Sequence, residues 1–201
     1  MAGWDADSPG LRRNLAKVLE SARGSAAGRV APKFEMARAW HGQAMSGLSV
    51  PDPAYVGRFR GEPGLVGCEV QIGNLPGVAS ADVHVQLLAF EAKLHRVMAE
   101  LDAQYPTGDD LDEDGLGAVI DVASWAHSEW VRIHPFANGN GRTARIWANF
   151  ILMRYGIPPV IRLRPRPAAA DYGSASAAAM KGDWGPTVAV FRAMVRDGCA
   201  L

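Results

Sequence analysis

Hydrophobic side chains recur at helical spacing through most of this chain. Residues 8–23 open with a Ser-Pro pair typical of a helix start, and their apolar side chains share one face: Leu11, Leu15, Val18 and Leu19. The same spacing predicts further helices over residues 80–104, 116–132 and 142–155. Runs of alanine favour helix, and residues 33–46, 168–181 and 186–197 also read as helices. We therefore expect a mainly α fold.

One segment departs from the helical pattern. Residues 65–72, LVGCEVQI, alternate loosely between apolar and polar side chains, and a GNLPG turn follows them. We expect this strand to belong to a small β-hairpin with Phe59 or its neighbours as the other arm. Because the sequence shows no internal repeat and no long linker, we predict a single globular unit with one hairpin.

Composition and charge narrow the classes of protein. The chain has 201 residues, of which 48% are hydrophobic, and its 21 Lys and Arg balance 21 Asp and Glu. This balance gives no sign of a nucleic-acid partner. No apolar stretch has the length of a membrane span, and the N-terminus does not resemble a signal peptide. With only Cys68 and Cys199, both expected to be reduced, we predict a cytoplasmic protein without membrane contact.

The chemistry concentrates in residues 133–145, IHPFANGNGRTAR. Asn-Gly pairs are typical of hairpin turns, but both flanks here read as helix, so the turn joins two helices. Glycines just before a helix N-terminus form an anion-binding nest beside unpaired N–H groups and the positive end of the helix dipole. Two arginines three residues apart project from the same side of the first turn. The combination predicts a polyphosphate site at Gly139, Asn140, Gly141, Arg142 and Arg145.

His134 lies in the same loop as this nest. An imidazole titrates near neutral pH and can take a proton from a hydroxyl, so we predict that His134 is a general base. Pro135 is expected to stiffen the loop, and Phe136 to anchor it in the core. The remaining histidines are expected to be structural: His41, His84, His95 and His127. The loose GxGxxA match lacks the preceding strand of a dinucleotide fold, and no Walker A lysine follows.

The segment HPFANGNGRTAR resembles the signature of the Fic family, HPFx(D/E)GNGRxxR. The preceding GRFRGEPGLVGCEVQIGN is similar to the family's flap hairpin, and RIWANFILMRYGIPPVI to the helix after its motif. The resemblance covers roughly residues 35–195. It implies a Fic-type helical core with the small hairpin over the active-site loop. It divides the chain into an N-terminal helical extension, 1–30, and a Fic domain, 31–201.

The resemblance also implies an activity and roles for residues. A Fic enzyme transfers AMP from ATP, with Mg²⁺, to a Ser, Thr or Tyr hydroxyl of a target protein. His134 would be the general base. The nest would hold the α- and β-phosphates, Arg142 would contact the phosphates, and Arg145 would pair with the γ-phosphate. The flap would hold the target segment by strand addition through Cys68, Glu69, Val70, Gln71 and Ile72.

Asn138 departs from the family pattern, because Asp or Glu usually ligates Mg²⁺ at this position. Asparagine keeps one oxygen and loses the charge, so it would be a weaker ligand. Three alternatives follow: a slower or more metal-dependent adenylyltransferase, an enzyme with another donor nucleotide, or a catalytically weak protein that binds nucleotide without turnover.

Regulation and the nucleotide pocket stay open at this point. No glutamate fits the family's inhibitory pattern (S/T)xxxE(G/N), which allows a toxin with a separate small antitoxin-like inhibitor, or an unregulated enzyme. Tyr172 is a candidate for the nucleotide pocket, with a core position as the alternative.

Overall fold

The computed structural model describes residues 7–107, 111–167 and 170–199. Within these ranges seven α-helices carry the fold, which confirms the expected mainly α class. Their positions agree with the hydrophobic pattern to within a few residues, and the predicted start at 168–169 lies outside the described residues. The helices are α1 Pro9–Ala27, α2 Phe34–Met45, α3 Val83–Gln104, α4 Glu113–Ile133, α5 Asn140–Arg154, α6 Ala170–Ala179 and α7 Gly185–Cys199. Short 3-10 turns, Pro53–Tyr55 and Ser80–Asp82, precede the hairpin and α3.

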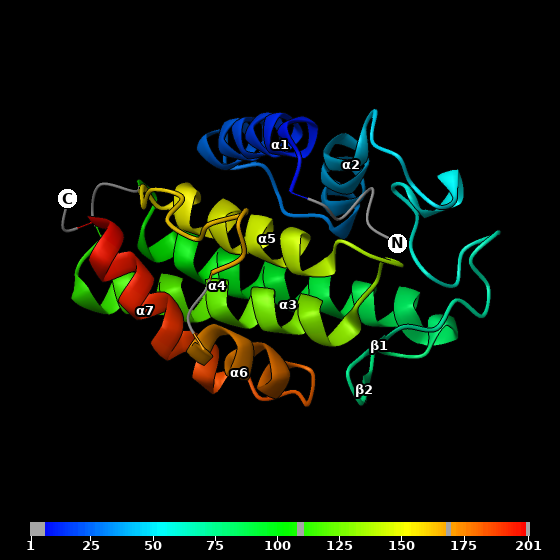
Figure 1. The fold of residues 1–201 in the computed structure, drawn as a ribbon. Coiled ribbons are helices and arrows are strands. Elements are labelled where there is room, and N and C mark those ends of the chain that lie inside the picture. The colour runs from blue at the N-terminus through cyan, green and yellow to red at the C-terminus, as the bar shows by residue number, and fades with distance from the viewer. Residues whose placement is uncertain (1–6, 108–110, 168–169, 200–201) are drawn as a thin grey trace.

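Helices α4 and α5 form the centre of the fold. Figure 1 shows α1 and α2 on one side of this pair and α6 and α7 on the other, while α3 runs along α4. Thirteen of the fifteen residues of α5 are buried, because other helices surround it. The loop between α4 and α5 is therefore held at both ends by the most deeply buried helices.

Aromatic side chains fill the core between these helices. The Trp147 ring meets Trp40 edge to face at 4.8 Å between centroids, and Phe90 lies 5.5 Å from both Trp130 and Trp147. Large aromatic rings contribute much of the apolar area that a core removes from water, and tilted or edge-to-face pairs add to that burial. The α4–α5 pair thus gives the connecting loop a rigid base.

Both ends of this loop use a left-handed backbone conformation. Helix α4 starts with the Asp112 carboxylate accepting the Gly115 N–H at 2.7 Å and ends at His134, which has φ 53°. Gly139, with φ 82°, directly precedes α5. The left-handed region is ordinary for glycine but uncommon for other residues. A histidine held there is a site of local strain at a helix end.

The hairpin differs from the predicted one in its pairing. β1, Gln71–Ile72, pairs antiparallel with β2, Leu75–Pro76, across a two-residue turn that starts at Gly73 (φ 59°). The prediction that Phe59 supplies the other arm is wrong. Phe59 is buried instead, with its ring 4.8 Å from Phe136, because its aromatic surface is better satisfied in the core than on an exposed hairpin.

The strand itself is shorter than predicted. Of residues 65–72 only the last two belong to a strand, although the Val70 carbonyl also accepts the Gly77 N–H across the hairpin at 3.0 Å. The earlier part follows turns, with the Cys68 N–H donating to the Leu65 carbonyl at 3.1 Å.

As for membranes, no helix in the three described ranges combines the length and apolarity that a bilayer span requires.

Candidate active site

His134 is fixed from three sides at the end of α4. Its backbone N–H donates to the Trp130 carbonyl at 3.0 Å, and its own carbonyl accepts from Nε of Arg60 at 2.8 Å. Its ring atom Nδ1 lies 2.9 Å from the carbonyl oxygen of Val131. These contacts offset the strain of the left-handed backbone and leave the ring one orientation.

The ring contacts also determine which nitrogen carries the proton. A carbonyl oxygen only accepts hydrogen bonds, so Nδ1 of His134 donates to Val131 and Nε2 keeps its lone pair. Burial lowers the pKa of His134 below its ordinary value, the Val131 carbonyl opposes that shift, and the nearby Arg60 cation adds to it. The imidazole is therefore neutral at pH 7, which is the state a general base needs.

Phe136 anchors the loop that follows. Its ring is fully buried and stacks on His41 at 4.1 Å with an interplanar angle of 16°. The Pro135 carbonyl accepts the backbone N–H of Arg60 at 2.7 Å. The loop is thus tied both to the core and to the segment that leads into the hairpin.

The side chain of Asn140 is hydrogen-bonded to the backbone of this loop. Its Oδ1 accepts the Phe136 N–H and its Nδ2 donates to the Phe136 carbonyl, both at 2.8 Å. This pair of bonds uses one donor and the acceptor of the amide, and Asn140 is almost fully buried. For a phosphate, Asn140 therefore offers its backbone N–H in the first turn of α5, where helix amides have no partner within the helix.

His41 is a structural histidine with a part in the site. Its Nδ1 accepts the Gly57 N–H at 3.0 Å, so its Nε2 carries the proton and donates to the Asn138 carbonyl at 3.0 Å. Burial lowers the pKa of His41 to about 4, against the raising effect of the Asn138 carbonyl. A Cβ added at Gly139 would lie 3.1 Å from Nε2 of His41, so the glycine also allows this close packing.

The two arginines of the motif lie on α5 and are almost fully buried. Nη1 of Arg145 donates to the Tyr172 hydroxyl, and its Nη2 to the Leu163 carbonyl, both at 3.0 Å. Since Tyr172 accepts from Arg145, its own proton is available to Nε2 of His127 at 2.9 Å. Burial lowers the pKa of His127 to about 3, so it stays neutral and accepts this bond. Arg142 lies one turn nearer the loop.

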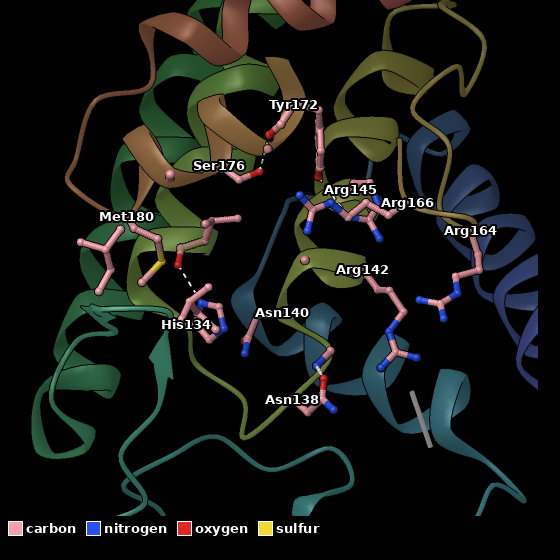
Figure 2. A pocket seen from close by; sticks show the side chains of 17 residues that line it. His134, Asn138, Asn140, Arg142, Arg145, Arg164, Arg166, Tyr172, Ser176 and Met180 are labelled. Atoms are coloured by element: carbon pink, nitrogen blue, oxygen red, sulfur yellow. Dashed lines mark hydrogen bonds between the residues drawn. The ribbon is translucent and has the colours of Figure 1, made fainter. Parts of the chain in front are cut away.

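A cavity of about 390 Å³ lies between the loop, α6 and the hairpin, and Arg142, Arg145 and Tyr172 are among the residues that line it. Figure 2 shows His134 and Asn138 on one side, and on the other Tyr172 and Ser176 of α6 with Met180 directly after the helix. All the residues predicted for phosphate binding line the cavity: Gly139, Asn140, Gly141, Arg142 and Arg145. Tyr172 was expected either to line the nucleotide pocket or to lie in the core. It does both, because it is almost fully buried and also lines the cavity.

The predicted flap residues divide into two groups. Ile72 lines the cavity, together with Leu75 from the facing strand. Glu69 instead accepts the Ser80 N–H at 2.9 Å, and the Cys68 carbonyl accepts from Nη1 of Arg60 at 3.1 Å. Cys68 and Glu69, like Val70 and Gln71, are not among the residues that line the cavity.

The site offers little to a divalent metal. Oδ1 of Asn138 accepts the N–H of Gly139, and no Asp or Glu is among the described residues that line the cavity. Residues 7–107, 111–167 and 170–199 also contain no group of three His, Cys, Asp or Glu side chains placed to hold a metal. Mg²⁺ usually binds proteins through one or two carboxylates and the substrate phosphates. The residues present therefore do not fit a protein-held Mg²⁺.

Several residues of the site have no local signal in the sequence. His41 and Arg60 reach the loop from segments more than seventy residues away. Arg164 and Arg166, in the basic connector between α5 and α6, also line the cavity. Only the family's lead-in segment, which contains Arg60, pointed to any of these positions.

Comparison with known proteins agrees with the fold and the motif. Residues 33–152, more than half of the chain, match the model of the Fic/DOC family. The chain therefore belongs to the Fic/DOC family. Two curated relatives carry the name protein adenylyltransferase: fic-1 of Caenorhabditis elegans is 46% identical over 69 residues, and Fic of Culex quinquefasciatus is 36% identical over 110.

These alignments cover limited parts of the proteins. The match to the Caenorhabditis elegans protein spans 34% of this chain and 13% of that relative, and the match to the Culex quinquefasciatus protein spans 55% and 18%. The chain thus aligns with less than a fifth of the length of either relative.

Solved structures show the same fold. A Fic-domain signalling protein from Bacteroides thetaiotaomicron superposes with a TM-score of 0.64 at 19% identity, over 92% of this chain and 68% of that one. Fic-1 from Caenorhabditis elegans gives a TM-score of 0.57 at 23% identity, over 98% and 54%. At these identities the likeness establishes the architecture, a helical Fic core with a small hairpin.

Proposed function

We propose that this chain transfers AMP from ATP to a hydroxyl side chain of a target protein. The observation that carries the proposal is a neutral histidine with a free Nε2 lone pair in the same cavity as a glycine nest and two arginines. Relatives named protein adenylyltransferase support the same class of reaction.

The proposed reaction is a substitution at the α-phosphorus. The target hydroxyl oxygen forms a bond to the α-phosphorus, the bond from that phosphorus to the bridging oxygen breaks, and pyrophosphate leaves. The hydroxyl proton goes to Nε2 of His134, whose Nδ1–H stays on the Val131 carbonyl. The backbone amides of the first turn of α5, with Arg142 and Arg145, stabilise the charge on the phosphates.

The hairpin is the proposed docking element for the target segment. Ile72 is half exposed at the cavity edge, and β1 has β2 on one side only in its two-stranded sheet. An extended peptide that adds to the free side of β1 would bring a hydroxyl toward His134. Backbone pairing reads few side chains, so the identity of the target depends on contacts elsewhere.

Intact-mass spectrometry tests the proposal. The protein is incubated with cell lysate and ATP, GTP, CTP or UTP, and the mass gain on any modified protein identifies the transferred group. We expect an AMP adduct with wild type and none with His134→Ala. His84→Ala is the matched control, because His84 is exposed on α3 and outside the cavity. Adduct formation by His134→Ala at the wild-type rate would refute the assigned base, and a clear adduct from another nucleotide would refute ATP as donor.

A catalytically weak nucleotide-binding protein is the competing proposal, and Asn138 is the observation that favours it. This protein would bind ATP and form no adduct, and His134→Ala would leave its binding unchanged. A separate inhibitor, as in a toxin–antitoxin pair, stays a prediction that co-purification with a small partner would support.

A further inference from the structure

A single buried guanidinium joins the hairpin to the end of α4. The Arg60 side chain has no solvent exposure, and each of the five N–H donors of its planar fork has an acceptor. On the α4 side, Nε donates to the His134 carbonyl at 2.8 Å and Nη2 to the Ile133 carbonyl at 3.1 Å. The acceptors on the hairpin side are the carbonyls of Val78 at 2.6 Å and Cys68 at 3.1 Å, and the Glu69 carboxylate at 3.3 Å.

Stability alone is a poor reason for a buried cation at this position. The Glu69 carboxylate is its charged partner, and that side chain is 57% exposed, so the ion pair is weak. Burial lowers the pKa of Arg60, because the charged form loses the stabilisation that water gives it. Apolar side chains often replace buried ions with no loss of stability. What an apolar side chain cannot reproduce is the fork, which holds two backbone segments at a fixed separation.

The hairpin also touches His134 directly. Gly77 follows β2, and its N–H donates to the Val70 carbonyl at 3.0 Å. A Cβ added at Gly77 would lie 3.0 Å from Cβ of His134 and 3.2 Å from Nη2 of Arg60, both closer than ordinary van der Waals contact. The glycine thus lets the returning arm of the hairpin lie against the histidine. Arg60 is bonded to both of these touching segments.

The separation of hairpin and histidine matters for the proposed reaction. A general base must lie within about 2.6–3.2 Å of the oxygen whose proton it takes, and a misplacement of about 1 Å can cost about 100-fold in rate. His134 has a strained left-handed backbone, and carbonyls at the end of a helix have no partner within that helix. The two bonds from Arg60 to such carbonyls stabilise this conformation. Its other bonds hold the hairpin on which the target segment would dock.

We propose that Arg60 is a positioning residue for the transfer reaction, which holds the hairpin at one fixed distance from the base His134. The inference rests on the proposed function for the reaction, and on the five bonds of the fork for the distance. Arg60 is not among the described residues that line the cavity, so its replacement should slow the transfer without weakening ATP binding.

Arg60→Lys tests the role of the fork. Lysine keeps a cation on a long stem, but its three donors share one nitrogen and cannot bridge both segments as a fork does. With saturating ATP, and lysate as the source of target, we expect the rate of AMP-adduct formation to fall by at least about tenfold. The Kd for ATP, measured by calorimetry, should change by less than about threefold. A role through charge alone would instead keep the wild-type rate.

Arg154→Lys is the matched control. Arg154 is also a buried arginine, with 5% of its side chain exposed, and it donates to the Asp102 carboxylate and the Val30 carbonyl, outside the cavity. This variant should also lose stability, and it should keep its adduct rate at a temperature where all the variants are folded.

NMR reports the distance itself and needs no target protein. In wild type the α-protons of Gly77 should give a nuclear Overhauser effect to the β-protons of His134, because the hairpin lies against the histidine there. Arg60→Lys should weaken or lose this signal, and Arg154→Lys should keep it.

Gly77→Ala perturbs the same distance with Arg60 intact. The added Cβ pushes the hairpin away from His134, so the adduct rate should again fall by at least about tenfold. Gly24→Ala is its control, because a Cβ at Gly24 would meet no atom within 4 Å. If Arg60→Lys does not fold, Gly77→Ala decides the question, and a wild-type adduct rate in that variant would refute the fixed distance.

The two readouts separate failure of the inference from failure of the proposed function. A folded Arg60→Lys variant that forms the adduct at the wild-type rate would overturn the inference while the proposed function stands. If wild type forms no adduct and Arg60→Lys loses the signal between Gly77 and His134, the proposed function fails and Arg60 still fixes the hairpin. An unchanged signal in Arg60→Lys would overturn the inference at any adduct rate.

Discussion

Replacing Asn140 with alanine tests whether its side chain holds the loop that carries His134. Oδ1 and Nδ2 of Asn140 each make a 2.8 Å bond to the backbone of Phe136, which is fully buried. The alanine variant leaves both Phe136 groups without partners, at about 1–3 kcal/mol for each group. We therefore expect the free energy of unfolding to fall by about 2–6 kcal/mol, a large share of a typical domain's stability.

Urea denaturation followed by circular dichroism measures this loss, and the loop predicts a second effect. Because the two bonds fix the loop that carries His134, we expect kcat for AMP transfer to fall by at least about tenfold. The Kd for ATP should change by less than about threefold, since the backbone N–H offered to phosphate remains.

Asn149→Ala is the matched control for this prediction. Asn149 lies on the same helix, is fully buried, and makes the same pair of bonds to the backbone of Ile161, at 2.7 and 3.1 Å. It should lose similar stability and keep much more of its kcat at a temperature where both variants are folded. A stable Asn140→Ala variant with tenfold weaker ATP binding would refute the reasoning. It would show that the side-chain amide of Asn140 contacts the phosphates instead of holding the loop.

Three further predictions concern protons and the buried chain behind Arg145. AMP transfer should decline only below about pH 6.5, as His134 becomes protonated, because its pKa is lowered; a pH–rate profile with its acidic midpoint above 6.5 would contradict this. Tyr172→Phe should weaken ATP binding and lower stability by about 1–3 kcal/mol, because both Arg145 and His127 lose a partner; equal calorimetric and urea results for variant and wild type would refute it. The pKa values of His41 and His127 are about 4 and 3, so only the unfolded chain takes up their protons as the pH falls below 6.5. Stability should therefore decrease between about pH 6 and 4.5 by about 1.4 kcal/mol per pH unit for each of the two histidines, and His41→Gln should remove the share of His41 from the slope in urea titrations.

Most of the helices were predictable from a long apolar stripe, and the short α6 from its run of alanines. The motif was predictable because it is contiguous. The hairpin pairing was not, since β1 and β2 have two residues each and are too short for a period-two pattern. Without such a pattern, nothing in the sequence distinguished the true second strand from the segment around Phe59. The packed core shows that the Phe59 ring lies against Phe136 instead.

The parts of the site contributed by distant segments were also not predictable. His41 and Arg60 bind the loop through its backbone carbonyls, and any loop sequence presents carbonyls, so no pattern in the motif points to these partners. The connector Arg164 and Arg166 read as a basic, proline-rich linker. Their place in the cavity lining depends on the path of that linker back along α5, which single-sequence patterns do not determine.

The contacts of Arg60 bear on how such a domain is given a new target. This one guanidinium, fully buried, donates to the carbonyls of Cys68 and Val78 on either side of the hairpin and to those of Ile133 and His134 at the end of α4. The hairpin proposed to dock the target and the proposed base are therefore both held by the same side chain. An exchange of hairpins between related domains should therefore transfer residues 60–80 together. A graft of 68–77 alone would leave out Arg60, whose bonds fix the position of the hairpin relative to His134.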